Sequence, residues 1–222
     1  MRRNIRKGDI VGRKSYGKDI FFVVDKMIKT SNRTFCILKG LTVRIEADSP
    51  LEDLELITRQ EALSRLKELD TKLYDRIDKA LNRARQTRDS IYQTGKILHL
   101  DGDKRYSNKS AKYYKSLGLD AIVKNIPENR QPFQVRSLLE RYKPDILVIT
   151  GHDAMLKNGR NYHDIYNYRN SRYFIATVQE ARKWRQDGNE LVIFAGACQS
   201  FFEAIMSSGA NFASSPARVL ID

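Results

Sequence analysis

The fold is decided by the stretch Asp145-Ile146-Leu147-Val148-Ile149-Thr150, which runs directly into Gly151-His152-Asp153. Its apolar residues do not alternate with polar ones, as they would in a strand with one face in water. A continuous apolar run of this length is typical of a strand in a parallel sheet that is covered on both faces. The pattern returns in Leu191-Val192-Ile193-Phe194-Ala195, followed by Gly196-Ala197-Cys198. The sequence therefore predicts an α/β fold.

The remainder of the chain from Thr94 onward alternates strands with helices. We predict strands at 96–100, 121–126, 145–150, 191–195 and 218–221, and helices at 107–117, 133–142, 171–186 and 201–208. This alternation favours a parallel sheet with helices on both faces. No helix follows the last predicted strand, so we expect a C-terminal segment to be missing from this α/β domain at 94–222.

Residues 1–58 show short strands separated by turn residues. We predict strands at 9–11, 19–27, 34–38, 42–46 and 54–57. Such spacing is typical of a small barrel, and we predict an SH3-like β-barrel. Cys36 falls within the third strand, where we expect a buried structural thiol.

Residues 59–93 change to a period of three to four residues, which predicts a long amphipathic helix linking the two domains. Its apolar stripe includes Leu63, Leu66, Leu69 and Leu73. We expect the stripe to dock on its own chain or on a second copy, which would form a homo-oligomer. A membrane surface is disfavoured because acidic residues interrupt the basic face.

Composition and charge exclude several classes of protein. The chain has 222 residues, of which 41% are apolar and 30% charged, as in an ordinary globular protein of one or two domains. Its longest apolar runs fall far short of the ~20 residues that cross a bilayer. The basic N-terminus lacks the apolar segment of a signal peptide. The net charge of +13 is spread along the chain, so nucleic-acid binding is not indicated.

Other chemistries find little support in the sequence. The two cysteines do not form a disulfide framework, which fits a reducing compartment. Phosphate-binding and dinucleotide-binding motifs are absent from the sequence. Asp101 and Asp103 lack a third ligand at suitable spacing. We therefore expect neither a cofactor nor a metal.

Two strands of the predicted parallel sheet end in residues that can do chemistry. Reactive positions in such sheets lie just beyond the carboxyl ends of the strands. His152 and Cys198 each follow a strand and a glycine-containing turn. If the two strands are neighbours, the imidazole and the thiol meet at one edge, where the thiol is a nucleophile and the imidazole its base. Either residue alone is more simply a packing residue, but the paired placement favours catalysis.

Residues next to this pair complete the predicted site. The helix expected from Phe201 would place its N-terminus near the thiol and favour the thiolate. Backbone amides near Cys198 and at Asp153 are expected to stabilise an oxyanion. Gly151, Gln199 and Ser200 are expected to line the substrate pocket.

An apolar strand that ends at His152 is followed about 50 residues later by an apolar strand that ends at Cys198. This arrangement resembles the caspase, legumain and gingipain clan of cysteine peptidases. The resemblance implies a caspase-like α/β domain. That clan usually has glycine after the histidine, whereas Asp153 follows it here. The amide of Asp153 would then take the place of the glycine amide in the oxyanion hole.

A closer resemblance covers nearly the whole chain. It rests on Gly8-Asp9-Ile10-Val11, Leu38-Lys39-Gly40-Leu41, Gly95-Lys96-Ile97-Leu98-His99-Leu100-Asp101-Gly102-Asp103, Thr150-Gly151-His152-Asp153, Tyr168-Arg169-Asn170-Ser171, Phe194-Ala195-Gly196-Ala197-Cys198-Gln199-Ser200 and Gly209-Ala210-Asn211-Phe212-Ala213-Ser214-Ser215-Pro216. In combination these segments resemble the YabG family of sporulation peptidases of spore-forming Firmicutes. The resemblance implies a cysteine peptidase of the sporulating cell's cytoplasm that associates with the spore coat or cortex. Its implied substrates are coat and cortex-associated proteins, cleaved after arginine.

Arginine specificity requires an acidic pocket, since burying an unpaired guanidinium is costly. The candidate acids are Asp101, Asp103, Asp153, Asp164 and Glu203. Asp153 is favoured because it adjoins His152. His163 lies in a polar stretch and is expected to be a surface or substrate-loop residue.

The far end of the linking helix carries an arginine cluster, Arg83, Arg85 and Arg88. An arginine-specific peptidase would find these sites in its own chain, where the helix end frays. We therefore expect self-cleavage between about Arg83 and Arg88.

Two other functions are open at this stage. A glutamine amidotransferase-like thiol hydrolase also places a cysteine after a strand, but its histidine normally follows the cysteine, and no histidine follows Cys198. The non-enzymatic alternative is a basic adaptor whose barrel binds RNA or coat proteins. The reactivity of Cys198, and its dependence on His152, distinguishes an enzyme from an adaptor.

Overall fold

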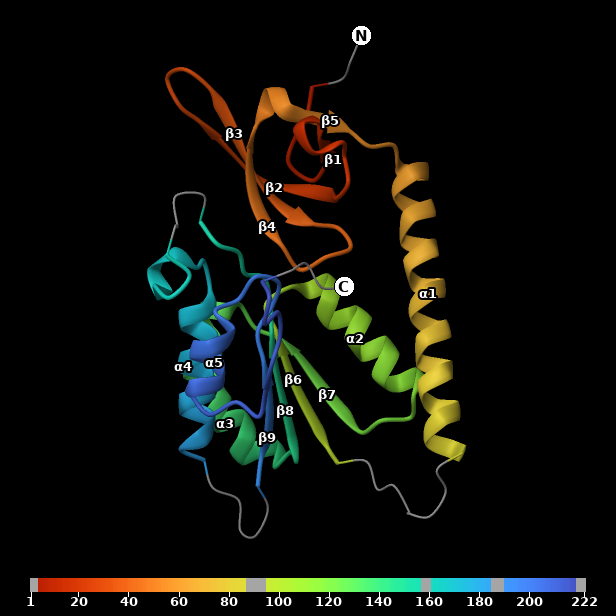
Figure 1. Ribbon diagram of the computed structural model, residues 1–222, viewed down its shortest axis with the longest axis vertical. Coiled ribbons are helices and arrows are strands. Elements are labelled where there is room, and N and C mark those ends of the chain that lie inside the picture. The colour runs from red at the N-terminus through yellow and green to blue at the C-terminus, as the bar shows by residue number, and fades with distance from the viewer. Residues whose placement is uncertain (1–3, 87–94, 157–160, 185–189, 219–222) are drawn as a thin grey trace. The chain divides into compact units, whose positions relative to one another are not determined.

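A computed structural model describes residues 4–86, 95–156, 161–184 and 190–218. The chain forms two compact units, residues 1–93 and 94–222 (Figure 1). Among the helices of the described residues, none is both long enough and apolar enough to cross a membrane.

The first unit contains a five-stranded antiparallel sheet in the order β4-β3-β2-β1-β5. Its strands are β1 (Ile10–Arg13), β2 (Phe21–Lys29), β3 (Thr34–Gly40), β4 (Glu46–Pro50) and β5 (Leu54–Leu56). Val11, Phe22, Cys36 and Leu38 are fully buried in its core. Burial raises the pKa of the Cys36 thiol, with a smaller contribution from Glu52, as expected for a structural cysteine. The SH3-like designation stays a prediction.

The fourth strand differs from the sequence prediction. We expected a strand at 42–46, but β4 occupies Glu46–Pro50 and residues 41–44 form a bend. β4 pairs with β3 from Lys39 opposite Glu46 to Phe35 opposite Pro50. Pro50 is tolerated because β4 is an edge strand and ends there, so the missing N–H interrupts no ladder.

Helix α1 (Arg59–Gln86) begins at a capping box. The Glu61 carboxylate accepts hydrogen bonds from the amide and hydroxyl of Thr58, whose hydroxyl oxygen in turn accepts from the amide of Glu61. At this end of the helix Ala62 is buried, whereas Leu63 is half exposed. The predicted helical residues 87–93 lie outside the described residues, and oligomerisation through this helix stays a prediction.

The second unit is built from five strands and four α-helices among its described residues. The strands are β6 (Ile97–Asp101), β7 (Ala121–Asn125), β8 (Ile146–Thr150), β9 (Val192–Ala195) and β10 (Phe212–Ala213), and the helices are α2 (Lys104–Ser116), α3 (Gln131–Tyr142), α4 (Ser171–Arg182) and α5 (Phe202–Ser207). The strands pair in parallel, in the order β10-β9-β8-β6-β7. The predicted α/β fold with a parallel sheet is thus confirmed.

The strand order places helices on both faces of the parallel sheet. The chain moves from β6 outward to β7 and then returns past β6 to β8, so right-handed crossovers put α2 on one face and α3 on the other. In agreement, α2 contacts β6 and β7, while α3, α4 and α5 pack against one another (Figure 1). The strand order reverses between β6 and β8. A ligand crevice is therefore expected at the carboxyl ends of these two strands. The caspase-like designation stays a prediction.

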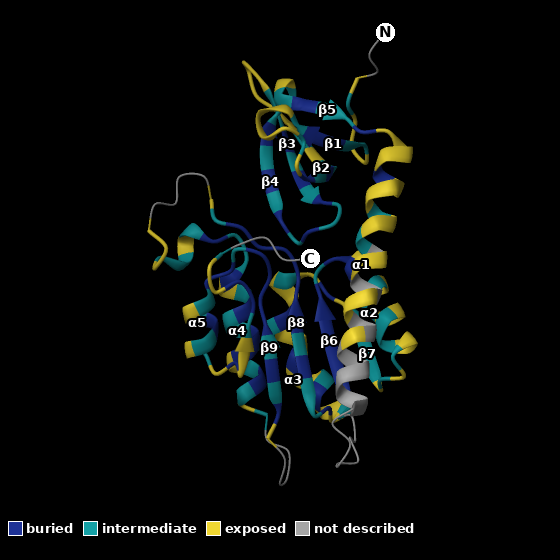
Figure 2. Ribbon diagram, turned by 45° about the vertical axis from the view of Figure 1, so that its right-hand side comes forward, coloured by how far each residue is buried: buried dark blue, intermediate teal, exposed yellow. Residues whose placement is uncertain are grey.

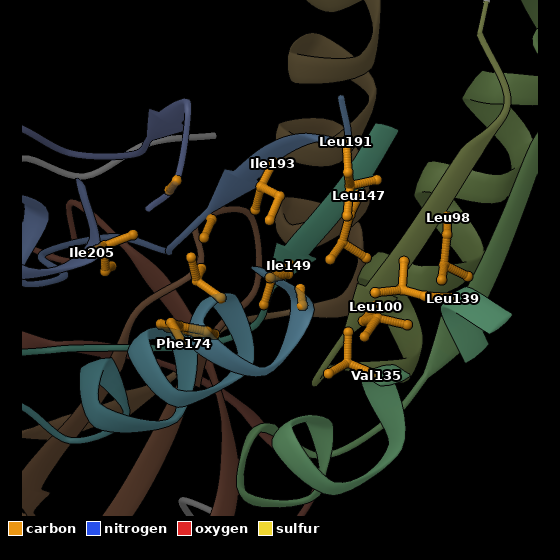
Figure 3. Packing of buried hydrophobic residues seen from close by; sticks show 14 of the residues in the cluster. Leu98, Leu100, Val135, Leu139, Leu147, Ile149, Phe174, Leu191, Ile193 and Ile205 are labelled. Atoms are coloured by element: carbon orange, nitrogen blue, oxygen red, sulfur yellow. The ribbon is translucent and has the colours of Figure 1, made fainter. Parts of the chain in front are cut away.

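The core of this unit lies between the sheet and the α3–α5 face. Leu98 and Leu100 of β6 meet Val135 and Leu139 of α3, and Phe174 of α4 packs in the same cluster (Figure 3). β7 and β10 are only partly buried, whereas the apolar residues of β6 and the side chains of Leu147, Ile149 and Ile193 are buried (Figure 2). Each such side chain contributes about 1.5–3 kcal/mol through burial, which makes the sheet a rigid support for the loops at its carboxyl edge.

The last predicted strand, at 218–221, falls mostly outside the described residues. Arg218, its first residue, lies in an irregular segment, and the structure places β10 earlier, at Phe212–Ala213, beside β9. Only two residues pair there, which is too short for a periodicity to be recognised from the sequence.

Candidate active site

The structure brings His152 and Cys198 to the same edge of the parallel sheet. β8 and β9 are neighbours, with Ile149 opposite Ala195. His152 and Cys198 each lie at the third position beyond this pair. Both side chains are buried, with exposed fractions of 2% for His152 and 0% for Cys198. The two residues therefore stand at equivalent positions after adjacent parallel strands.

The imidazole of His152 is anchored by Asp103. Its Nε2 lies 2.9 Å from Oδ2 of Asp103, and the ring of Tyr106 meets it edge-on with the centroids 5.7 Å apart. Because an ionised carboxylate only accepts hydrogen bonds, Nε2 carries the proton in the neutral ring. Nδ1 therefore holds the lone pair. Buried Nδ1 has no hydrogen-bond partner among the described residues, so it is available to take a proton.

Asp103 also caps helix α2. Its Oδ1 accepts hydrogen bonds from the amides of Arg105 and Tyr106. Burial acts to raise the pKa of Asp103, but the hydrogen bond and charge of His152, together with Arg105, outweigh it and hold the pKa well below its usual range. From the sequence, Asp103 was a candidate ligand for a substrate arginine, and a role beside His152 was not predicted. The signal that was missed is an aspartate immediately before a helix.

Asp101 belongs to a buried polar network beneath Asp103. Its Oδ1 accepts from the amide of Asp103 and its Oδ2 from the hydroxyl of Thr150. Thr150 also bonds to Nε2 of His99, whose Nδ1 bonds to Tyr114. His99 is thus packed and hydrogen-bonded inside the sheet, and the fully buried carboxylate of Asp101 supports the loop.

Glu128 is a site residue that the sequence analysis missed. Its Oε1 accepts a hydrogen bond of 2.7 Å from the amide of His152. A Cβ atom at either Gly102 or Gly151 would collide with this carboxylate. The two glycines that follow β6 and β8 therefore leave room for Glu128 at the sheet edge. Gly151 allows this close approach, and its place in the substrate pocket stays a prediction.

The loop that carries Cys198 is tightly turned. Gly196 has φ +119°, and a Cβ atom at this position would collide with the hydroxyl of Ser214. Gln199 has φ +56°, which is uncommon for a residue other than glycine. The Ser200 hydroxyl accepts from the amide of Ala197, so it closes the turn from inside. Helix α5 has only six residues and begins at Phe202, and we assign it no role in stabilising the thiolate.

Asp153 is an internal brace. Its Oδ1 accepts from the amides of Ala154 and Asn170, and its Oδ2 accepts from the hydroxyl of Ser171. The oxygen of Ser171 in turn accepts from the amide of Phe201, so Asp153 connects the β8 loop to the segment after Cys198. Burial raises the pKa of Asp153 to about 7. Because the side chain is fully buried, it is unsuited to receive a substrate arginine.

The other predicted site residues are distributed differently. Asp164 caps the short turn at Ile165–Asn167, and His163 is exposed, with its ring centroid 6.4 Å from that of Phe201. Glu203 pairs with Arg218. Arg83 and Arg85 fall within α1, whereas Arg88 lies outside the described residues. No group of three potential metal ligands comes together in the described part of the chain.

A pocket of about 370 Å³ opens beside the cysteine loop. It is lined by Met155, Tyr162, Gln199, Ala217 and Arg218. A larger pocket, of about 600 Å³, lies in the first unit and includes Ile5, Met27 and Leu54. The smaller pocket contains Gln199, the residue directly after Cys198.

Comparison with known proteins identifies the family of the chain. The model of the family described as YabG peptidase U57 matches residues 6–222. The chain is 41% identical over 230 residues to the sporulation-specific protease YabG of Bacillus subtilis (strain 168), covering 96% of this chain and 79% of that protein. No solved structure is a significant match. The predicted sporulation protease, a hydrolase acting on proteins, is thereby confirmed, and the chain belongs to the YabG peptidase U57 family.

Proposed function

We propose that this protein is a cysteine endopeptidase in which Cys198 is the nucleophile, His152 the general base and acid, and Asp103 the residue that orients His152. The observation that carries the proposal is the state of the His152 ring, with Nε2 bound to Asp103 and Nδ1 buried without a partner among the described residues. A base held in this way is ready to accept the proton of a thiol.

The reaction follows from these roles. Nδ1 of His152 takes the thiol proton, and the thiolate of Cys198 attacks the carbonyl carbon of the scissile bond. The protonated imidazole, stabilised by Asp103, gives its proton to the leaving amine as the C–N bond breaks and a thioester forms. Water then attacks the thioester while Nδ1 takes its proton, and the acid product leaves as the thiol is restored.

Oxyanion stabilisation falls to amides of the cysteine loop in this proposal. The amide of Gln199 donates a hydrogen bond of 3.2 Å to Oγ of Ser215. A substrate carbonyl oxygen would have to replace that hydroxyl. The replacement keeps the amide of Gln199 hydrogen-bonded, because the Ser215 hydroxyl and the substrate carbonyl are both oxygen acceptors.

The proposed substrates are spore coat and cortex-associated proteins, cut after arginine, and the proposed location is the sporulating cell's cytoplasm with association to coat or cortex. Support comes from the relative, whose name describes a sporulation-specific protease. The basic net charge of +13 suits acidic protein surfaces.

The test is cleavage of an arginine-containing peptide by the purified protein. Cys198→Ala and His152→Ala should each lower kcat/KM by about 10³-fold or more, and Cys36→Ala is the matched control because Cys36 is buried in the other unit. Equal cleavage by wild type and Cys198→Ala would contradict the proposal. Inactivity of every form toward this peptide would contradict cleavage after arginine.

A further inference from the structure

Arg218 lies among three aromatic rings and a carboxylate. Its Nε donates a hydrogen bond of 2.6 Å to the hydroxyl of Tyr168, and its Nη2 donates one of 2.5 Å to Oε2 of Glu203. The guanidinium carbon lies 5.4 Å from the ring centroid of Tyr162 and 5.9 Å from those of Tyr168 and Phe201. The side chain of Arg218 is only 14% exposed. We call these four partners the arginine seat.

The arginine seat has the chemistry that a guanidinium selects. Aromatic faces attract the delocalised cation, and a carboxylate supplies a charge-assisted hydrogen bond. The rings of Tyr168 and Phe201 are stacked, with centroids 5.1 Å apart and an interplanar angle of 10°. Both rings are buried, so the seat is held in shape by the fold.

The seat adjoins the proposed nucleophile. Gln199, which directly follows Cys198, and Tyr162 of the seat line the same pocket, together with Met155 and Arg218. Phe201 of the seat comes three positions after Cys198 on the same loop. A side chain bound in the seat is therefore next to the cysteine loop.

The segment 214–218 covers that loop. The hydroxyl of Ser214 donates to the carbonyl of Ala197, and Oγ of Ser215 accepts from the amide of Gln199. These two contacts flank Cys198, whose side chain is fully buried. The segment thus places the Ser215 hydroxyl oxygen on the amide of Gln199, where a substrate carbonyl oxygen would bind. It also places Arg218 in the arginine seat, as a substrate arginine would be placed.

We propose that the arginine seat is the subsite for the arginine side chain of a protein substrate, and that residues 214–218 fill it as an internal occupant. This rests on the proposed function of Cys198 as the nucleophile. Glu203, Tyr162, Tyr168 and Phe201 then determine specificity for arginine. Because the seat accepts a substrate only while Arg218 is out of it, the apparent affinity for substrate is lowered by the fraction of time that the seat is filled.

Binding to the Cys198→Ala protein tests the proposal without turnover. The probe is N-acetyl-arginine methylamide, measured by calorimetry, and its citrulline analogue controls for shape without charge. Arg218→Ala should tighten binding of the arginine probe about tenfold or more. Arg172→Ala is the matched control because Arg172 is an exposed arginine that lies over Tyr173. In the Arg218→Ala protein, Glu203→Gln should weaken binding about tenfold.

A second readout is alkylation of Cys198 by iodoacetamide in protein that retains the cysteine. Arg218→Ala should speed labelling of Cys198 severalfold and leave Cys36, the internal reference, unchanged. Thermal unfolding reports whether each variant is folded. If Arg218→Ala does not fold, Arg218→Gln, which removes the guanidinium but keeps a shorter polar side chain, is measured in the same way.

The outcomes separate this proposal from the proposed function. Unchanged probe affinity and unchanged Cys198 labelling in folded Arg218→Ala would overturn the arginine seat and make Arg218 a structural brace. Equal binding of the citrulline analogue would do the same. Failure of the catalytic proposal has a different signature, namely equal peptide cleavage by wild type and Cys198→Ala.

Discussion

Nε2 of His152 lies 2.9 Å from Oδ2 of Asp103, a contact that spans 49 positions of the sequence. It joins the loop after β8 to the residue that caps α2. The same carboxylate therefore orders a helix terminus and fixes the imidazole, so its two roles can be separated by a substitution that preserves only one of them.

Asp103→Asn is expected to keep the helix cap and lose the orientation of His152. Asparagine is as good an N-cap as aspartate, but its amide group does not stabilise the imidazolium as a carboxylate does. We expect kcat to fall by about 10²–10⁴-fold, with the melting temperature nearly unchanged. Peptide cleavage and thermal unfolding measured on the same preparation check this, and wild-type kcat in the variant would refute the positioning role.

Asp153→Asn is expected to change how stability depends on pH. The pKa of Asp153 is raised to about 7 in the fold, against about 3.9 in an unfolded chain. The contribution of protonated Asp153 to the free energy of unfolding is therefore complete below about pH 4, and it is lost as the pH rises through 7. The variant lacks this loss and should gain stability relative to wild type over that interval, on the order of 4 kcal/mol at most by pH 8.

Denaturant unfolding of both proteins from pH 4 to pH 8 measures this difference. Asn170→Ala is a suitable companion variant, because it removes the side-chain hydrogen bond from Asn170 to the carbonyl of His152 but keeps the ionisable group. If the difference in unfolding free energy between Asp153→Asn and wild type is the same from pH 4 to pH 8, the raised pKa of Asp153 is contradicted.

Gly151→Ala is expected to destabilise the second unit. A Cβ at this position would collide with the carboxylate of Glu128 and approach its Cγ to 2.7 Å. Overpacking of this kind costs about 1–3 kcal/mol. In a Glu128→Ala background the colliding atoms are gone, so the cost of Gly151→Ala should shrink. A double-mutant cycle of unfolding free energies tests the coupling, and strictly additive effects would show that Glu128 is not the obstacle.

Self-cleavage is expected near the end of α1, between about Arg83 and Arg88. The described helix ends at Gln86, and helix ends open more readily than helix interiors. Mass spectrometry of stored wild-type protein should show the fragments, whereas Cys198→Ala should stay intact. Fragments in both samples would indicate a contaminating protease, and intact protein in both would exclude the prediction.

The sequence by itself determined four of the five described strands of the parallel sheet, at β6 to β9, and the residues that follow β8 and β9. Continuous apolar runs at 145–150 and 191–195 identify buried strands because burial on both faces leaves no position for polar residues. Parallel strands share a carboxyl edge, so the placement of His152 and Cys198 at one edge follows once the strands are neighbours. Family membership was likewise accessible from short segments distributed along the chain.

Only the tertiary structure decided the partners of those residues. The contacts of Asp103 with His152, of Glu128 with the His152 amide, and of Arg218 with Glu203 join segments that are separate in the sequence. Loops carry no periodicity, and a carboxylate in a loop has the same local signature whether it caps a helix, braces a turn or binds an arginine. The role that each carboxylate takes depends on which strands are adjacent and how far each loop extends. These are properties of the folded sheet rather than of any local stretch of sequence.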